Sequence, residues 1–259
     1  MIDSHCHLEQ KDYDSDRDAV IEKCKAEGIK AVISSCAHPN DFNKGKEIVE
    51  RYKNFVFLAA GIHPHYAKEL TDKEIESAFN WLRDNANILS GIGEQGLDYS
   101  WAKEPKWREK QQKLFIKLIE LAKELNKVII VHARDSHSDV IRILEQQEAE
   151  VVQLHMWEEN KFARQIIEHG WYVSIGPIVA RSKKHRKVVR DIPIEQLMLE
   201  TDSPWFGGKD VNGKPLRGDP TNIKIPAREI AKTKKIDVND VWKICGKNAI
   251  RLFSLPIRI

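Results

Sequence analysis

The chain has 259 residues and a formal net charge of +3, and these values already narrow the kind of protein it can be. With 41% hydrophobic and 31% charged residues, it is long enough to bury a large core, so we expect a single globular domain over residues 1–259. The net charge is too small to indicate nucleic-acid binding by itself.

The sequence indicates neither secretion nor membrane insertion. The four cysteines are widely spaced and form no Cys-x-x-Cys pair, which argues against a disulfide framework and a zinc ribbon. The first residues contain no basic stretch followed by an apolar region, and the longest apolar run, residues 55–62, is too short to span a bilayer. We therefore expect a cytoplasmic protein with reduced, buried thiols and no membrane partner.

Eight short apolar or β-branched runs predict β-strands. In chain order they are the opening segment and residues 31–35, 55–62, 88–94, 128–133, 151–155, 172–175 and 197–200. Segments with the helical spacing of apolar residues lie between them. A helix is predicted over residues 18–27, and Gly28 directly after it is a stop signal. Thr71 and Glu74 have the spacing of a capping box, which marks the start of another helix. The longest predicted helix, residues 107–125, places four leucines on one face.

This alternation of strand and helix predicts an α/β fold. Eight βα units of roughly thirty residues, with strands that read as continuous apolar runs, fit a parallel sheet closed into a (β/α)8 TIM barrel. A doubly wound open sheet is the structural alternative. Residues 203–222, rich in Gly, Pro and Asp, predict a long loop after the eighth strand, which lies on the catalytic face of a barrel.

The first predicted strand carries a His-x-His pair. Successive side chains of a strand point to opposite faces, so His5 and His7 share one face and Cys6 packs on the other. Two imidazoles on one face form half of a metal site, although both rings can instead make hydrogen bonds inside the barrel.

More metal-capable side chains follow other predicted strands. They are His63, His65, Glu94, His132, His155 and Asp202. The carboxyl ends of the strands form the active-site face of barrel enzymes, so we expect side chains from distant parts of the chain to converge there, with the metal site at that face.

The chemistry of this set predicts hydrolysis by a metal-activated water. The imidazoles of His5, His7, His132 and His155 and the two carboxylates suit Zn²⁺, Mn²⁺ or Fe²⁺, and they outnumber the ligands of one zinc ion. We therefore predict two ions about 3.5–4 Å apart, bridged by Glu94. Asp202 can also accept the proton of the attacking water; the alternative is that it caps a helix.

Five motifs resemble those of the TatD-type metal-dependent deoxyribonucleases of the amidohydrolase superfamily. They are Asp3-Ser4-His5-Cys6-His7, Gly61-Ile62-His63-Pro64-His65, Gly93-Glu94-Gln95-Gly96-Leu97-Asp98-Tyr99, His132-Ala133-Arg134 and Glu200-Thr201-Asp202-Ser203-Pro204. The resemblance covers essentially the whole chain. It implies that His5, His7, Glu94 and Asp202 hold one ion, and that Glu94, His132 and His155 hold the other. It also implies exonucleolytic cleavage of DNA from the 3′ end with Mg²⁺ or another divalent metal.

The chain departs from the family pattern in loops that are expected to touch substrate. Gln95 replaces the usual Ile, residues 155–159 read His-Met-Trp-Glu-Glu in place of His-Cys-Phe-Ser-Gly, and Gly218-Asp219-Pro220 replaces Asn-Glu-Pro. Two acidic residues beside the metals repel a phosphate backbone unless they point away.

Several other residues are candidates for substrate contacts. Arg134, two residues after His132, can hold a phosphate with two hydrogen bonds, or it can form a structural ion pair. We expect His65 to contact the substrate or to orient a metal ligand. His63 has the same spacing, and the alternative for it is a ring packed in the core. The basic run at residues 181–187 can follow phosphates or form a solvated helix face.

Aromatic residues also follow strand ends. Tyr99, Trp101, Trp157, Trp205 and Phe206 can stack on the bases of single-stranded DNA, although such rings more often pack loops down.

We therefore predict a cytoplasmic hydrolase that cleaves phosphodiesters, as a 3′–5′ exodeoxyribonuclease with two divalent ions (Mg²⁺, Mn²⁺ or Zn²⁺) and single-stranded DNA ends as its partner. Glu94 and Asp202 are the expected catalytic residues, and no obligate protein partner is indicated. One alternative is a metallohydrolase of the same superfamily acting on an ester, amide or aminoacyl-tRNA linkage. Another is a non-catalytic metal-binding protein.

Overall fold

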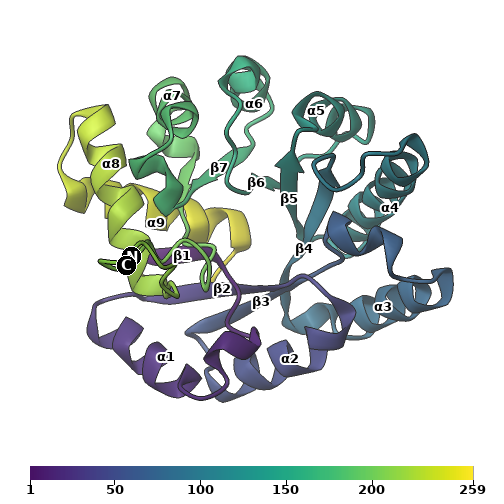
Figure 1. The fold of residues 1–259 in the computed structure, drawn as a ribbon, viewed down its shortest axis with the longest axis horizontal. Coiled ribbons are helices and arrows are strands. Elements are labelled where there is room, and N and C mark those ends of the chain that lie inside the picture. The colour runs from purple at the N-terminus through teal and green to yellow at the C-terminus, as the bar shows by residue number, and fades with distance from the viewer. Residues whose placement is uncertain (259) are drawn as a thin grey trace.

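A computed structural model describes residues 1–258, which form eight parallel strands surrounded by helices (Figure 1). The strands are β1 (Ile2–Cys6), β2 (Ala31–Cys36), β3 (Val56–Ala60), β4 (Leu89–Asp98), β5 (Val128–Arg134), β6 (Val152–Leu154), β7 (Tyr172–Ile175) and β8 (Leu197–Leu199). They lie in one sheet in chain order. Just beyond β8, the backbone N–H of Asp202 donates to the carbonyl oxygen of His5 at 3.0 Å, which joins the last strand to the first.

The helices alternate with the strands and form the outer ring of Figure 1. They are α1 (Arg17–Ala26), α2 (Phe42–Arg51), α3 (Asp72–Asp84), α4 (Pro105–Glu124), α5 (His137–Gln146), α6 (Ala163–Glu168), α7 (Lys183–Asp191), α8 (Lys224–Lys234) and α9 (Val238–Phe253). Short 3-10 helices include η3 (Pro64–Lys68), η6 (Pro177–Ala180) and η8 (Pro220–Ile223). The (β/α)8 barrel is confirmed, and the open doubly wound sheet is wrong.

Most predicted elements lie within two residues of the observed ones, and β4 is the main exception. We predicted that it ends at Glu94, but it continues to Asp98 because Gln95 to Asp98 pair with Val131 to Arg134 of β5. The capping box of α3 is confirmed, since Thr71 Oγ1 accepts from the backbone N–H of Glu74 and the Glu74 carboxylate accepts from that of Thr71.

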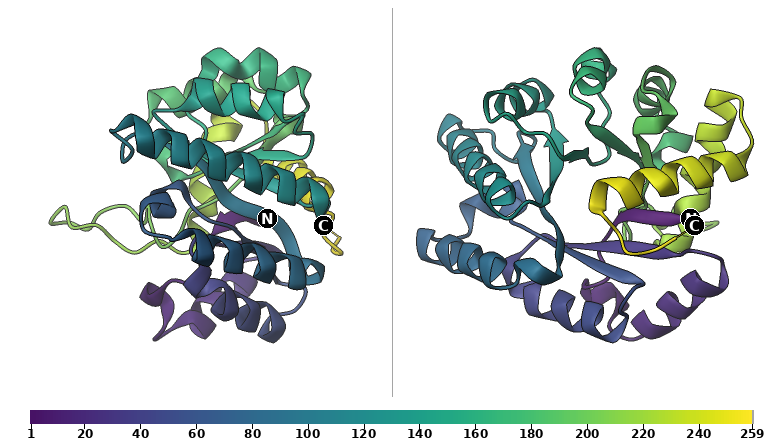
Figure 2. Two further views of the ribbon diagram at one scale, coloured as in Figure 1. Left: turned by 90° about the vertical axis from the view of Figure 1, so that its right-hand side faces the viewer. Right: turned by 180° about the vertical axis from the view of Figure 1, so that it is seen from behind.

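The apolar core lies on both sides of the sheet. Outside the barrel, the predicted leucine face of α4 packs against the strands through Leu114, Leu118 and Leu121, which are all buried. Inside, a smaller cluster joins Ile2, Ile33, Val128 and Ile130 of the strands to Leu252, Phe253 and other residues at the end of α9. Figure 2 shows α9 crossing the end of the barrel opposite the loop after β8. One end of the barrel interior is therefore apolar, and the polar interior lies at the other end.

The predicted loop after β8 projects from the body of the molecule (Figure 2). Its base is tied down by the hydroxyl of Tyr13, which donates to the carbonyl of Gly218 at 2.7 Å, and by the pairing of Arg217 with Asp16 at 2.6 Å. Its tip is a small two-stranded turn with a bridge between Lys209 and Pro215. Among residues 1–258, no helix combines the length and the apolarity that a membrane crossing requires.

Candidate metal centre

His5, in β1, and His7, the residue directly after β1, lie side by side. Both rings are buried, and their Nε2 atoms lie 3.1 Å apart. His5 Nε2 is 3.5 Å from a carboxylate oxygen of Glu94, and His7 Nε2 is 3.2 Å from Oδ1 of Asp202. Strands β1, β4 and the segment after β8 therefore place two imidazoles and two carboxylates around one point.

The other two predicted histidines join the same cluster from β5 and from the residue directly after β6. His132 Nδ1 lies 2.8 Å from Oε1 of Glu94, and His155 Nε2 lies 3.5 Å from the same oxygen. His155 also stacks on His5 with ring centroids 3.9 Å apart. All six side chains that the sequence predicts as ligands therefore lie in one place, with Glu94 in contact with each histidine of the set.

Local backbone geometry makes this convergence possible. A Cβ atom added to Gly61 would lie 2.7 Å from the Cα of Gly93, so the absence of a side chain lets the ends of β3 and β4 approach each other beside Glu94. Asp202 has φ of +53°, a left-handed conformation that is uncommon for residues other than glycine. Its N–H bond to His5 holds that conformation, and such residues concentrate at functional sites.

Three buried carboxylates hold the histidine rings from behind, and we did not assign them a role from the sequence. Glu200 accepts a hydrogen bond from Nδ1 of His155 at 2.9 Å, Glu9 lies 3.4 Å from Nδ1 of His7, and Asp98 lies 3.2 Å from Nε2 of His132. A carboxylate on one ring nitrogen orients the imidazole and leaves the other nitrogen free for a metal.

A two-residue spacing relates each of these carboxylates to a predicted ligand in the sequence. Glu9 continues the two-residue spacing of His5 and His7, and Asp98 continues that of Glu94 and Gly96 on the long strand β4. Glu200 has the same spacing from Asp202, but its contact with His155, 45 positions earlier, is not indicated by spacing.

The two histidines after β3 take different positions. His63 Nε2 lies 3.8 Å from Oε1 of Glu94, and its ring packs on His132 with centroids 4.4 Å apart. His63, Glu94 and His132 together form a further group with metal-binding geometry. The ring of His65 instead stacks on the indole of Trp101 at 4.2 Å, outside the ligand cluster.

The cluster has a marked charge pattern. For Glu94 and Asp202, burial favours the neutral acid, but the charges of neighbouring imidazoles outweigh it and hold the pKa of both below the usual range. Burial lowers the pKa of His5, and it lowers the pKa of His63 to about 3. For His155, burial is outweighed by the carboxylates of Glu200, Glu94 and Asp202, which raise its pKa to about 10. The carboxylates of Glu94 and Asp202 are therefore ionised at neutral pH.

The donor set fits a divalent metal. Atoms bonded to one ion at about 2.0–2.2 Å lie roughly 3.0–3.6 Å apart, depending on coordination geometry. The His5–His7, His7–Asp202 and His5–Glu94 separations of 3.1, 3.2 and 3.5 Å fall within this range. Three groups of candidate ligands share His5 or Glu94: His5, His155 and Asp202; His5, His7 and Glu94; and His63, Glu94 and His132.

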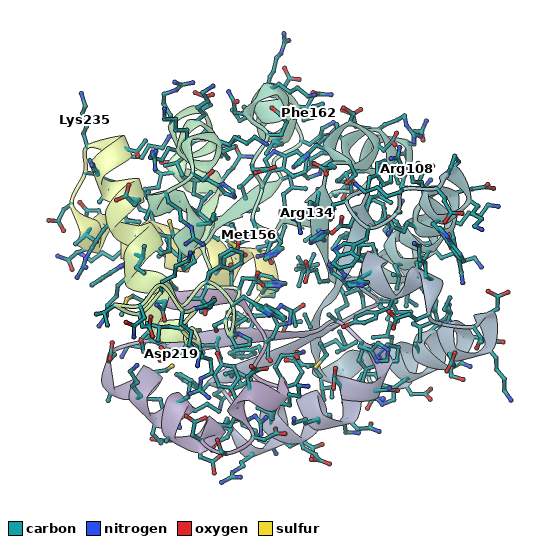
Figure 3. All side chains as sticks on the ribbon, viewed as in Figure 1. Arg108, Arg134, Met156, Phe162, Asp219 and Lys235 are labelled. Carbon is teal, nitrogen blue, oxygen red and sulfur yellow. The ribbon has the colours of Figure 1, made fainter. Side chains whose placement is uncertain are left out.

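Arg134 lies at the end of β5 and is exposed. Figure 3 shows it near the centre of the barrel mouth, as it does Met156, whereas Phe162 and Lys235 lie on the outer ring. Within residues 1–258, its guanidinium forms no ion pair, so nothing described there supports the structural ion pair that was the alternative for this residue.

The basic run at residues 181–187 divides between two environments. Ser182 caps α7, and the ring of His185 is buried, with Nε2 3.2 Å from the carbonyl oxygen of Met156. Lys184 pairs with Glu158 at 3.1 Å. This pairing compensates one of the two acidic residues that the sequence places after β6, and so reduces the repulsion of phosphates that we expected from them.

Known proteins match this chain over nearly its whole length. The sequence model of the family described as TatD related DNase matches residues 2–254. The human protein named deoxyribonuclease TATDN3 is 35% identical over 262 aligned positions, which cover 98% of this chain and 94% of that protein. An uncharacterized metal-dependent hydrolase of Bacillus subtilis, YabD, is 34% identical over 98% of this chain and 99% of its own length.

Solved structures share the fold. A TatD family hydrolase from Entamoeba histolytica superposes with a TM-score of 0.86 at 23% identity, over 97% of both chains. The Escherichia coli TatD homolog YJJV gives a TM-score of 0.87 at 22% identity, over 99% of this chain and 98% of that one. With the family match over nearly the whole length, the site geometry and the barrel, the chain belongs to the TatD-related DNase family.

Proposed function

We propose that this protein is a divalent-metal-dependent exodeoxyribonuclease that removes nucleotides from the 3′ ends of DNA. The observation that carries the proposal is the convergence of four imidazoles and two ionised carboxylates at the mouth of the barrel. The name of the human relative, a deoxyribonuclease, supports DNA as the substrate. The four cysteines, all free and buried, support a reducing compartment such as the cytoplasm.

We assign the ligands as the family resemblance implies. His5, His7, Glu94 and Asp202 hold one ion, Glu94, His132 and His155 hold the other, and Mg²⁺, Mn²⁺ and Zn²⁺ are the candidate metals. When bound, such ions lower the pKa of water and stabilise negative charge on a phosphoryl group. Glu200, Glu9 and Asp98 keep the rings of His155, His7 and His132 in position.

Asp202 accepts the proton of the attacking water. Neighbouring histidines hold its pKa below the usual range despite its burial, so its carboxylate is ionised at neutral pH. The water oxygen forms a bond to phosphorus, and the water proton passes to Asp202. One ester P–O bond breaks, its electron pair leaves with the departing ester oxygen, and that oxygen takes up a proton from solvent. Arg134, free of ion pairs in the described chain, binds a neighbouring phosphate, and His65 lies beside the bound strand.

The direct test is digestion of end-labelled single-stranded DNA by the purified protein with Mg²⁺, Mn²⁺ or Zn²⁺. We expect stepwise release of nucleotides from the 3′ end and no release in EDTA. A panel of ester, amide and aminoacyl substrates is included, because the same chemistry can act on a carbonyl carbon. Hydrolysis of one of these without any cleavage of DNA would overturn the nuclease assignment.

Asp202→Asn tests the proton acceptor. Because an amide cannot accept the water proton, we expect kcat on DNA to fall by about 10²–10⁴-fold. The amide oxygen can still coordinate a metal, so we expect metal content, measured by elemental analysis, to remain substantial. Full activity in this variant would exclude Asp202 as the proton acceptor.

A further inference from the structure

Two tryptophans beside the candidate metal centre are exposed to solvent. Trp101 follows β4 and is 54% exposed, and Trp205 follows β8 and is 49% exposed. By contrast, Trp157 and Trp171 are fully buried. An exposed indole leaves a large apolar face in water, and such faces at the rim of a site commonly bind a ligand.

Trp101 forms the outer layer of an aromatic stack on one side of the cluster. Its ring lies 4.2 Å from that of His65, with the two planes 24° apart, and His65 in turn stacks on Tyr66 at 5.6 Å. The neighbouring His63 reaches Glu94. One indole face is therefore supported from behind. The ring of His65 lies 6.3 Å from that of His63, which is the neighbour of Glu94.

Trp205 stands on another side of the same cluster. Its ring packs edge-on against His7, with centroids 4.8 Å apart. It lines a groove of about 500 Å³ whose other walls include Phe206, Leu216 and the cationic side chains of Arg181, Lys209 and Arg217. Arg217 is paired with Asp16, but Arg181 and Lys209 have no ion-pair partner in the part of the chain that the structure describes.

We propose that Trp101 and Trp205 are base-stacking platforms for single-stranded DNA. Each indole binds one nucleobase, and the two bases lie on opposite sides of the phosphodiester that faces Glu94. This inference rests on the proposed function and specifies its substrate. Arg181 and Lys209 then lie where the phosphates on the Trp205 side pass.

A nucleobase is the occupant that this combination suits. Each base has a flat π-face, so stacking on an indole is strong and tolerant of sequence. The combination of an aromatic face with unpaired cations matches a chain that alternates bases and phosphates. Within a duplex both faces of a base are covered by its neighbours, so the platforms favour single-stranded ends.

The experiment compares an ordinary single-stranded oligonucleotide with one that has abasic sites on both sides of the cleaved phosphodiester. Both are tested with the wild-type protein, Trp101→Ala, Trp205→Ala and Trp205→Phe. Ile167→Ala, on the outer helix α6 and 38% exposed, is the matched control for removal of an exposed apolar side chain. Binding is measured in EDTA by fluorescence anisotropy, and kcat and KM are measured with the active metal.

We expect each Trp→Ala change to weaken binding and raise KM for the ordinary strand by about 5- to 150-fold, equivalent to about 1–3 kcal/mol. On the abasic strand the same changes cost far less, because the base that the indole contacts is missing. Trp205→Phe keeps an aromatic face and recovers most of the loss, and Ile167→Ala behaves as wild type. Thermal midpoints of the variants report on folding.

The other outcomes separate this inference from the proposed function. Equal losses on ordinary and abasic strands would overturn base stacking while the nuclease assignment stands. Binding that depends on bases and on both tryptophans, without cleavage by any metal, would overturn the nuclease assignment but retain the platforms. If the wild type sediments as a dimer and the variants as monomers, with no selective loss on the ordinary strand, the base-stacking proposal is overturned and the two indoles belong to a contact between copies.

Discussion

Glu200 is a fully buried carboxylate that contacts His155, the backbone next to His155 and a hydroxyl of β7. One oxygen accepts from Nδ1 of His155 at 2.9 Å and from the hydroxyl of Ser174 at 2.6 Å, and the other accepts from the N–H of Met156 at 2.9 Å. In Glu200→Gln the amide group removes one of these acceptors and destabilises the metal-binding orientation of the ring. We expect about a 10- to 100-fold loss of metal affinity.

Isothermal titration of the metal-free variant with Zn²⁺ or Mn²⁺ measures this loss. Glu195→Gln is the matched control, because Glu195 is exposed in the turn before β8 and lies outside the site. If Glu200→Gln binds metal as tightly as the control, then His155 is held by its other contacts or is not a ligand.

The convergence of the candidate metal ligands could be predicted from the sequence, whereas the contacts of the groups that orient them could not all be predicted. His5, His132 and Asp202 stand at strand ends, and a parallel barrel brings strand ends together whatever the details of packing. The role of Glu200 depends instead on which side chain lies opposite it across β7. The position of His63 beside Glu94 depends on the turn into η3, which spacing alone does not define.

At the scale of elements, the loop after β8 is fastened to the barrel by Asp219. Its carboxylate accepts from the N–H of Thr221 at the start of η8 and pairs with Lys23 of α1 at 2.7 Å. Burial tends to raise the pKa of Asp219, but its hydrogen bonds to Lys23 and Thr221 outweigh that and lower it. A carboxyl whose pKa is lower in the folded state stabilises the protein above the unfolded value, near 3.9, and this contribution disappears as pH falls through the folded pKa.

Asp219→Asn isolates this contribution, because asparagine also caps helices but does not titrate. We expect the variant to be less stable by about 0.5–1 kcal/mol at pH 7 and the difference to shrink below about pH 4. Urea denaturation at a series of pH values measures it. A difference that stays constant down to pH 3 would assign the effect to packing rather than to charge.

The buried face of helix α4 contributes to the stability of the protein, whereas its exposed face contributes little. Leu118 is fully buried between α4 and the strands, whereas Lys117 on the same helix is exposed. Leu118→Ala removes buried apolar volume that its neighbours cannot fully refill, and we expect a loss of about 2–5 kcal/mol in the free energy of unfolding. Lys117→Ala, the matched control, should stay within about 0.5 kcal/mol of wild type in the same denaturation experiment.

At the scale of the whole molecule, the barrel was predictable because each strand repeats the same physical pattern. A strand covered on both sides must be apolar throughout, and the eight runs showed this with helical spacing between them. The end of β4 was predicted too early because Glu94, Gln95 and the glycines at 93 and 96 interrupt the apolar run, although the ladder to β5 continues. For residues 203–222 the sequence predicted a loop but not its shape, because the shape depends on contacts with distant residues, such as that of Tyr13 with Gly218.

The candidate ligands lie in β1, β4 and β5 or just beyond the ends of β1, β6 and β8, so a bound metal links the first and last parts of the barrel. Binding that is confined to the folded state adds stability of about 2.7 kcal/mol at a metal concentration of 100 times Kd. For a chain of this size that corresponds to a rise of roughly 5–10 °C in the unfolding midpoint, at about 2–4 °C per kcal/mol. EDTA should reverse it.

Calorimetry of the wild type, His7→Ala and His169→Gln measures this effect. The quantity compared is the metal-induced change in midpoint within each protein, so any loss of stability caused by the substitution itself cancels. His7→Ala should lose most of the change, because His7 lies within 3.2 Å of Asp202 in the cluster. His169 is exposed next to Trp171 on the outer surface, so His169→Gln should keep it. An equal change in all three proteins would place metal binding outside the cluster at the mouth of the barrel.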